Sequence, residues 1–203
     1  MNIYHPVYKC MDKYAMQQLF KHLPFLDTAE YTDYYLNKSL SRFSHQPPEM
    51  FYLRYDLPEL NTGITKNLNE QLMENLGFPS IDYALVFKHR LPQPIHIDGH
   101  SFVRQSSLNL PLIGYENTKM IFYNLKSKDE PCLHTDAFYF NEDSVEYNCE
   151  LPGDNNWVLV NTSIPHRIIN SDPQNPRITV CFRFKTNPTY EHLSNLIDKH
   201  LKC

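Results

Sequence analysis

The chain has 203 residues and a formal net charge of −4, and 41% of its residues are hydrophobic and 13% aromatic. This composition supports a packed core and excludes a disordered chain, and the length suits one domain over 1–203. No run rich in lysine or arginine stands out, so the composition disfavours nucleic acid as a partner. No stretch approaches the roughly 18 apolar residues of a membrane span, and the amino-terminal segment lacks the apolar run of a signal peptide.

The five cysteines are widely scattered and never form a C-x-x-C pair. This spacing argues against a disulfide framework and against a structural zinc site. It favours a reducing compartment, so we expect a cytoplasmic protein. Each cysteine is then expected to be a small buried or surface residue.

Helical spacing of apolar residues dominates the first eighty residues. It predicts a helix within 12–23, and Thr28 is a typical start for a second helical segment. A third predicted helix has apolar residues at four-residue steps from Ile64 to Leu76 and ends at Gly77, a typical C-cap. We therefore expect a helical layer at the amino-terminal end of the domain.

From residue 81 the pattern changes to short strands separated by turn-like clusters. The predicted strands are 82–89, 94–98, 106–113, 119–125, 136–141, 156–161, 165–170 and 177–184. Eight short strands in series favour a closed sandwich or jelly roll. The expected fold is mainly β with flanking helices: a helical part over 1–80, a jelly-roll core over 81–185, and a carboxyl-terminal helix within 186–203.

Three residues form a candidate metal site: His96 and Asp98 in IHIDG, and His166 in SIPHRIIN. Two neutral imidazoles and one carboxylate on one face of Fe(II) leave the opposite face open for a cosubstrate and dioxygen. Strand alternation puts His96 and Asp98 on the same face, and Gly99 lets the chain turn directly afterwards. For His166 the alternative is a core histidine whose ring nitrogens are hydrogen-bonded.

Arg177, in PRITVCFRF, begins the last predicted strand. Alternation places Arg177, Thr179, Cys181 and Arg183 on one face of that strand. If this face is inward, a buried arginine needs an anionic partner, and its fork of donors matches a carboxylate. The hydroxyl of Thr179 can add a hydrogen bond. The alternative is an Arg–Glu pair on a solvated face.

With these residues the chain resembles the Fe(II)/2-oxoglutarate-dependent dioxygenase superfamily. The run from PIHIDG to PRITVCFRF is similar to the aspartyl/asparaginyl β-hydroxylase branch, which includes the cis-proline hydroxylases. The resemblance implies a double-stranded β-helix, the jelly-roll type. It also implies roles for five residues: iron binding by His96, Asp98 and His166, and binding of the distal carboxylate of 2-oxoglutarate by Arg177 and Thr179.

A second His-x-Asp pair, His134 and Asp136, competes with the first, because so short a motif also arises by chance. In jelly-roll oxygenases the pair lies early, with several strands before the distal histidine. Four predicted strands separate His96 from His166, but only two follow His134 before it. We therefore choose the first pair and expect the second in a solvated loop.

Three more residues are candidates around this centre. Asn109 falls where the resembled branch often has a polar residue that binds cosubstrate, and the alternative is a strand-edge amide. Arg104 and Arg183 are candidates to bind substrate, and the alternative for Arg104 is a solvated surface position. The aromatic segment 31–55 either covers the mouth of the site or forms the underside of the helical layer.

The resemblance implies an enzyme that hydroxylates an amino acid or a peptide side chain and releases succinate and CO2 from 2-oxoglutarate. Two alternatives stay open. The spacing of Arg177 and Arg183 is shared with AlkB-like nucleic-acid demethylases, against which the net charge and the lack of a basic run count. A jelly-roll binding or structural module without turnover is the other, and the intact set of candidate ligands counts against it.

Overall fold

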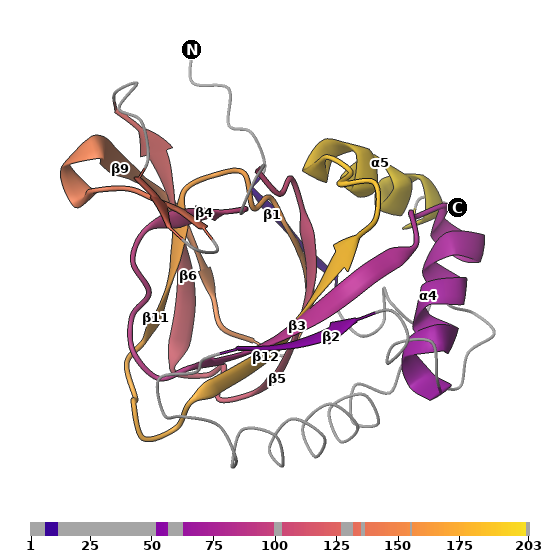
Figure 1. Ribbon diagram of the computed structural model, residues 1–203, viewed down its shortest axis with the longest axis horizontal. Helices are drawn as coiled ribbons and strands as arrows, with labels where there is room; N and C mark the ends of the chain where they lie inside the picture. Colours follow the sequence, from indigo (N-terminus) through magenta and orange to yellow (C-terminus); the bar gives the residue numbers. More distant parts are fainter. Residues whose placement is uncertain are drawn as a thin grey trace.

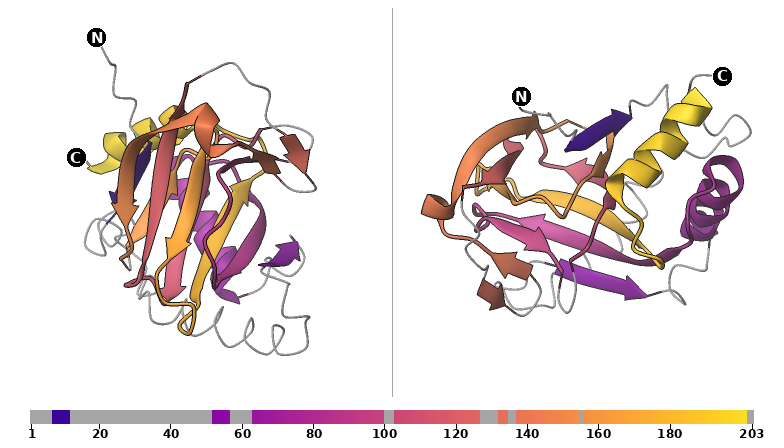
Figure 2. Two further views of the ribbon diagram at one scale, coloured as in Figure 1. Left: turned by 90° about the vertical axis from the view of Figure 1, so that its left-hand side faces the viewer. Right: turned by 90° about the horizontal axis from the view of Figure 1, so that it is seen from above.

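The computed structural model describes residues 7–11, 52–56, 63–99, 103–126, 132–134, 137–154 and 156–201. Within these ranges the chain forms two antiparallel six-stranded sheets that face each other (Figure 1). Two helices, α4 (Gly63–Leu76) and α5 (Tyr190–Leu201), lie together at one side of the molecule (Figure 2). None of the helices in the described ranges has the length and apolar character needed to cross a membrane.

The strands of each sheet follow a fixed order. The major sheet has the order β1 (Tyr8–Met11), β10 (Trp157–Val160), β5 (Ser107–Ile113), β12 (Arg177–Phe184), β3 (Ile81–His89), β2 (Tyr52–Asp56). The minor sheet has the order β7 (Cys132–His134), β8 (Ala137–Tyr139), β4 (His96–Asp98), β11 (His166–Asn170), β6 (Thr118–Leu125), β9 (Val145–Pro152). The short 3-10 helix η1 (Glu142–Ser144) leads into β9.

The path of the chain between the sheets is that of a jelly roll. Strands β3, β4, β5 and β6 alternate between the major and the minor sheet, and β10, β11 and β12 alternate again. This winding places β12 between β3 and β5, and β11 between β4 and β6. The predicted fold class, a mainly β jelly roll with flanking helices, is confirmed.

Each of the eight predicted strands has a counterpart in the structure, and so does the carboxyl-terminal helix. Helix α4 ends as predicted before Gly77, whose φ of 68° suits glycine, and the next two backbone N–H groups bond back to Met73 and Leu72. Strands β1, β2, β7 and β9 were not predicted. The predicted helices within 12–23 and after Thr28 lie outside the described residues.

The structure describes only one residue of the alternative pair, His134 and Asp136. His134 is the last residue of β7, which pairs with β8, so the predicted loop is wrong for its backbone. Asp136 lies outside the described residues, as does most of the aromatic segment 31–55. Only the backbone of β2 is described at the end of that segment, where it forms the outer strand beside β3.

The two faces of the major sheet have different surroundings. Its outer face packs under α4 and α5, where Leu72, Val86, Val180 and Leu193 share one apolar cluster. Its inner face meets the minor sheet, where Phe122, Val158 and Val160 share a second apolar cluster. The rest of the inner face of β12 carries polar side chains that are buried. Because such groups need partners when water is excluded, this interior is the place to look for a binding site.

Candidate metal and cosubstrate centre

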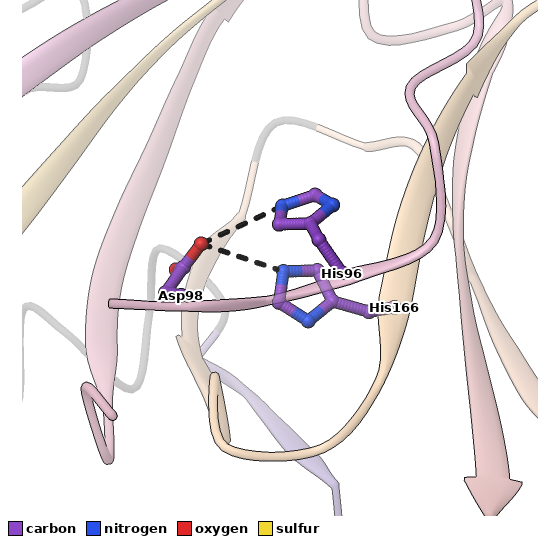
Figure 3. A group of neighbouring side chains, drawn as sticks. All are labelled: His96, Asp98 and His166. Carbon is purple, nitrogen blue, oxygen red and sulfur yellow. Dashed lines mark ion pairs between the residues drawn. The ribbon is translucent and has the colours of Figure 1, made fainter. Parts of the chain in front are cut away.

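The three candidate metal ligands come together between the sheets. His96 and Asp98 lie on β4, and His166 begins the neighbouring strand β11, directly opposite His96. The Nε2 atoms of His96 and His166 lie 3.5 and 4.0 Å from Oδ1 of Asp98 (Figure 3). One ligand atom from each of the three lies within 4.8 Å of the others. Such a group can surround one metal ion, which lies about 2 Å from each nitrogen or oxygen ligand.

Backbone carbonyls orient both imidazole rings. Nδ1 of His96 lies 2.9 Å from the carbonyl oxygen of Pro94, and Nδ1 of His166 lies 2.8 Å from that of Ile164. Because a carbonyl only accepts, Nδ1 carries the proton in each neutral ring and donates it. Nε2 then keeps its lone pair on the side of Asp98. This is the tautomer that a histidine needs to bind a metal through Nε2.

A buried arginine holds the third ligand. Nη2 of Arg183, on β12, donates to Oδ2 of Asp98, while Nη1 donates at 3.3 Å to the carbonyl of Ser106 and at 3.4 Å to the hydroxyl of Thr162. Oδ1 of Asp98 therefore faces the two histidines while Oδ2 is tied to the opposite sheet. The sequence suggested Arg183 as a substrate-binding residue, but the structure engages its guanidinium with Asp98.

Burial and nearby charges set the protonation of the ligands. Burial by itself raises the pKa of Asp98, but the positive charge of Arg183 and the contacts with His96 and His166 outweigh it and hold the pKa well below its usual range. Burial, and then the charge of His96, lowers the pKa of His166 to about 4. At neutral pH the site thus offers a carboxylate and a neutral imidazole, the forms that bind a divalent cation.

Arg177 is buried at the start of β12 with few partners of its own. It is 6% exposed, and its Nε donates to Oγ1 of Thr179 at 2.8 Å. Within the described part of the chain no carboxylate pairs with it, so the Arg–Glu alternative finds no support there. Burial lowers the pKa of Arg177, but an arginine stays charged in proteins. A buried guanidinium with open donors is a fitting place for an anion.

Asn109 lies in the middle of the major sheet, not at its edge. Strand β5 pairs with β10 on one side and β12 on the other, and Asn109 stands opposite Cys181. It is buried, and its Oδ1 accepts a hydrogen bond of 2.5 Å from the hydroxyl of Ser107. The structure therefore excludes the strand-edge alternative and puts this amide on the inner face, in the row of residues next to Thr179.

Arg104 lies beside the candidate centre. Its backbone N–H donates to the carbonyl of Asp98 at 2.7 Å, and its guanidinium carbon is 5.4 Å from the ring centroid of Tyr83. Tyr83 in turn stands opposite Arg183 across β3 and β12. Because Arg104 is only half-buried, it is placed at the border of the interior rather than within it.

One polar residue of this interior was missed by the sequence analysis. His89 is the last residue of β3, stands opposite Arg177, and is 4% exposed. The sequence carried a signal, a histidine at the end of a predicted strand. It does not say which strand lies alongside, and only the pairing of β3 with β12 brings His89 next to Arg177.

Comparison with known proteins gives similarity of fold. No family model and no curated protein matches the chain. Among solved structures, EvdMO1 superposes with a TM-score of 0.50 at 13% identity, over 78% of this chain and 44% of that one. A prolyl-4-hydroxylase of Pseudomonas putida gives a TM-score of 0.47 at 11% identity, over 88% and 92% of the two chains. SnoN, an epimerase in complex with Fe3+, alpha ketoglutarate and nogalamycin RO, gives 0.46 at 12% identity, over 88% and 78%.

Proposed function

We propose that this chain is an Fe(II)- and 2-oxoglutarate-dependent oxygenase that hydroxylates an amino acid or a peptide side chain. The observation that carries the proposal is the group formed by His96, Asp98 and His166. Two histidines and one carboxylate are the donor set of mononuclear non-haem iron oxygenases. The hydrogen bonds from the two Nδ1 atoms to backbone carbonyls, and the one from Arg183 to Asp98, orient these side chains as the ligands of metal sites are usually oriented.

In this proposal the protein holds the metal with Nε2 of His96, Nε2 of His166 and Oδ1 of Asp98. When bound, iron and 2-oxoglutarate together supply the oxidising chemistry, which no side chain of the protein can supply. Arg183 keeps Asp98 from turning away, and the carbonyls of Pro94 and Ile164 keep the two rings in position. The work of these groups is orientation, because the donor atoms must meet the metal without rearrangement.

Arg177 is proposed to bind the distal carboxylate of 2-oxoglutarate, with Thr179 fixing the guanidinium through its hydroxyl. The support is chemical: a buried, charged fork of donors has no carboxylate partner among the described residues. A planar guanidinium matches a carboxylate with two parallel hydrogen bonds. Asn109, which stands opposite Cys181 on the neighbouring strand β5, is proposed to contact the same ligand.

The substrate is proposed to be an amino acid or a peptide, on the strength of the sequence resemblance and the net charge of −4. A nucleic-acid enzyme would need a positively charged track for the phosphates. Arg104, at the border of the interior and beside the ligand strand β4, is the proposed contact for a substrate carboxylate. The acidic composition gives no sign of such a phosphate track.

The metal site is tested by binding, without turnover. The protein is purified anaerobically, and binding of Mn(II), a stand-in for Fe(II), is measured by calorimetry. The wild type should bind one ion, and Ala in place of His96, Asp98 or His166 should weaken binding at least 10- to 100-fold. The matched control is His134→Ala, which should bind as the wild type does. Loss of the ion in His134→Ala together with normal binding by His96→Ala would show that the wrong pair has been chosen.

The substrate class is tested by turnover. Free amino acids, peptides and methylated single-stranded DNA are supplied in turn with Fe(II) and 2-oxoglutarate, and succinate and the mass of each candidate are measured. A gain of one oxygen atom on an amino acid or peptide, matched by succinate, is the expected result. Succinate that rises only with DNA, together with loss of its methyl group, would move the protein to the nucleic-acid demethylases.

A further inference from the structure

The end of β3 brings a histidine next to Arg177. The register pairs His89 directly with Arg177, as it pairs Phe87 with Thr179. Directly opposed residues of antiparallel strands project to the same face. Val86, three residues earlier and so on the other face of β3, packs in the outer core under the helices. His89 therefore belongs to the inner face, which looks toward the candidate metal ligands on the minor sheet.

The backbone of His89 is held by a hydrogen bond, whereas its ring makes none to the part of the chain that the structure describes. The carbonyl oxygen accepts a hydrogen bond of 3.0 Å from Nδ2 of Asn170, which fixes the strand end against β11. The ring stacks on Phe87 with 5.4 Å between centroids and 12° between planes. Within the described residues no group bonds to either ring nitrogen. The side chain is 4% exposed, and its ring nitrogens are free to hydrogen-bond to a ligand that enters this end of the interior.

A neutral His89 ring suits the place beside Arg177, because Arg177 already balances the charge of a bound anion and the ring needs only to donate a hydrogen bond. Burial, and then the charges of Arg177 and His96, lowers the pKa of His89 to about 3. The neutral ring has one N–H to donate. His89 also lies outside the group of side chains whose ligand atoms gather around the metal position. Its open N–H is thus available to a ligand at the Arg177 end.

We propose that His89 is a cosubstrate-binding residue, which donates a hydrogen bond from its neutral ring to the distal carboxylate of 2-oxoglutarate beside Arg177. This inference rests on the proposed function and deepens it. Arg177 supplies charge and His89 supplies a second direction of contact, from the neighbouring strand. Two donors on different strands define where the far end of the dicarboxylate lies, and thereby which 2-oxo acids fit.

The experiment compares two 2-oxo acids on the Mn(II)-loaded full chain by calorimetry. 2-Oxopentanoate has the chain length of 2-oxoglutarate but a methyl group in place of the distal carboxylate. His89→Phe should weaken 2-oxoglutarate about 10- to 100-fold, the loss of one hydrogen bond to a charged group, and leave 2-oxopentanoate and Mn(II) binding unchanged. His89→Gln keeps an N–H donor and should recover part of the loss. His192→Phe, an exposed histidine on α5, is the matched control and should change nothing.

The outcomes separate the two proposals. An equal loss for both 2-oxo acids, or a loss of Mn(II) binding, would make His89 a structural residue and overturn its assignment. So would full 2-oxoglutarate affinity in His89→Phe. Should His89→Phe not fold, the comparison of both acids in His89→Gln decides in the same way, with a smaller selective loss expected. A wild-type protein that binds Mn(II) but no 2-oxoglutarate would overturn the proposed function together with the role of His89.

Discussion

Two arginines on one face of β12 have partners of different charge. Arg183 meets a carboxylate of the chain, Asp98, and is satisfied within the described structure. Arg177, six residues earlier on the same strand, bonds among the described residues only to the hydroxyl of Thr179. Both are buried, so both have lost the hydration of their charge. The difference fits the proposal that Arg183 holds the protein's own carboxylate and that Arg177 binds the carboxylate of 2-oxoglutarate.

The Arg183–Asp98 pair makes a prediction about stability. Arg183→Met leaves Asp98 buried without its counter-charge and should lower the free energy of unfolding of the metal-free protein by about 3–5 kcal/mol. In the double variant with Asp98→Asn both charges are gone, so its loss should be smaller than the sum of the two single losses, by roughly 0.5–3 kcal/mol. Urea unfolding of the four proteins measures this coupling. Additive losses would show that the two side chains do not stabilise each other.

Arg177 makes a prediction about affinity. Arg177→Ala should weaken 2-oxoglutarate by about 30- to 1,000-fold, because a charge-assisted bidentate contact contributes roughly 2–4 kcal/mol. Arg177→Lys should recover only part of this, since an ammonium group lacks the planar fork. Titration of the Mn(II)-loaded variants with 2-oxoglutarate measures both. Unchanged affinity in Arg177→Ala would remove Arg177 from the proposed site.

Single residues of the centre were predictable to different degrees. His96 and Asp98 form a short local motif, the order of the strands adds His166, and the structure brings the three together. The bond between Arg183 and Asp98 joins residues 85 apart in the chain, so no local pattern indicates it. His89 was missed for the same reason, because its partner Arg177 is set by strand pairing.

At the scale of elements, local alternation was a good guide where a strand is buried. All eight residues of β12 are buried. Ile178, Val180, Phe182 and Phe184 pack in the core under the helices, and the residues that alternate with them face the minor sheet. Strand β9 was missed although Val145, Tyr147, Cys149 and Leu151 alternate with polar residues. It is an edge strand that pairs only with β6, and Tyr147 is 61% exposed, so the alternation only partly matches burial.

Two glycines with similar backbone angles, Gly77 and Gly114, allow a test of the contact between Gly114 and the start of β12. Gly77 and Gly114 have φ of 68° and 67°, so Ala at either should cost about 1–2 kcal/mol in backbone conformation. A Cβ at Gly77 would lie 4.0 Å from the Leu196 side chain, whereas at Gly114 it would lie 2.4 Å from the carbonyl oxygen of Pro176 and 3.1 Å from Cα of Arg177. Gly114→Ala must therefore displace the start of β12.

The expected result is a difference between the two variants in stability and in ligand binding. Gly114→Ala should lose a further 1–3 kcal/mol or so relative to Gly77→Ala, the usual cost of forcing atoms into filled space. It should also weaken 2-oxoglutarate while Mn(II) affinity stays near that of the wild type, because Arg177 moves and the ligand strands β4 and β11 do not. Urea unfolding and calorimetry measure the two effects. Equal behaviour of the two variants would mean that the junction yields without moving Arg177.

At the scale of the whole molecule, the two faces of the major sheet differ: one packs against the helices, and the other borders the candidate centre. Its outer face is apolar and covered by α4 and α5, while its inner face carries buried polar groups that face the candidate ligands of the minor sheet. Two buried histidines of this interior, His89 on the major sheet and His166 on the minor sheet, are kept neutral by burial, with pKa values lowered to about 3 and about 4. The interior that prepares the site for its ligands therefore makes the fold sensitive to acid.

The sign of this sensitivity follows from proton uptake. An unfolded histidine takes up a proton as the pH falls through about 6.5, but His89 in the folded protein does not until near its lowered pKa of about 3. Between these values the unfolded state binds more protons, so stability is greatest above pH 6.5 and falls as the pH falls. From pH 7 to pH 5 a histidine of this kind costs about 2 kcal/mol of unfolding free energy.

Removal of that titrating ring should make the pH dependence of stability shallower. The metal-free His89→Phe protein should lose about 2 kcal/mol less than the wild type between pH 7 and pH 5, whatever its stability at pH 7. Urea unfolding at several pH values, with a chelator present so that no metal holds His166 neutral, measures the two slopes. His192→Phe makes the same substitution at an exposed position of α5 and is the comparison variant. Parallel curves for His89→Phe and the wild type would mean that His89 titrates in the folded protein much as it does in the unfolded chain, and that its ring is open to water.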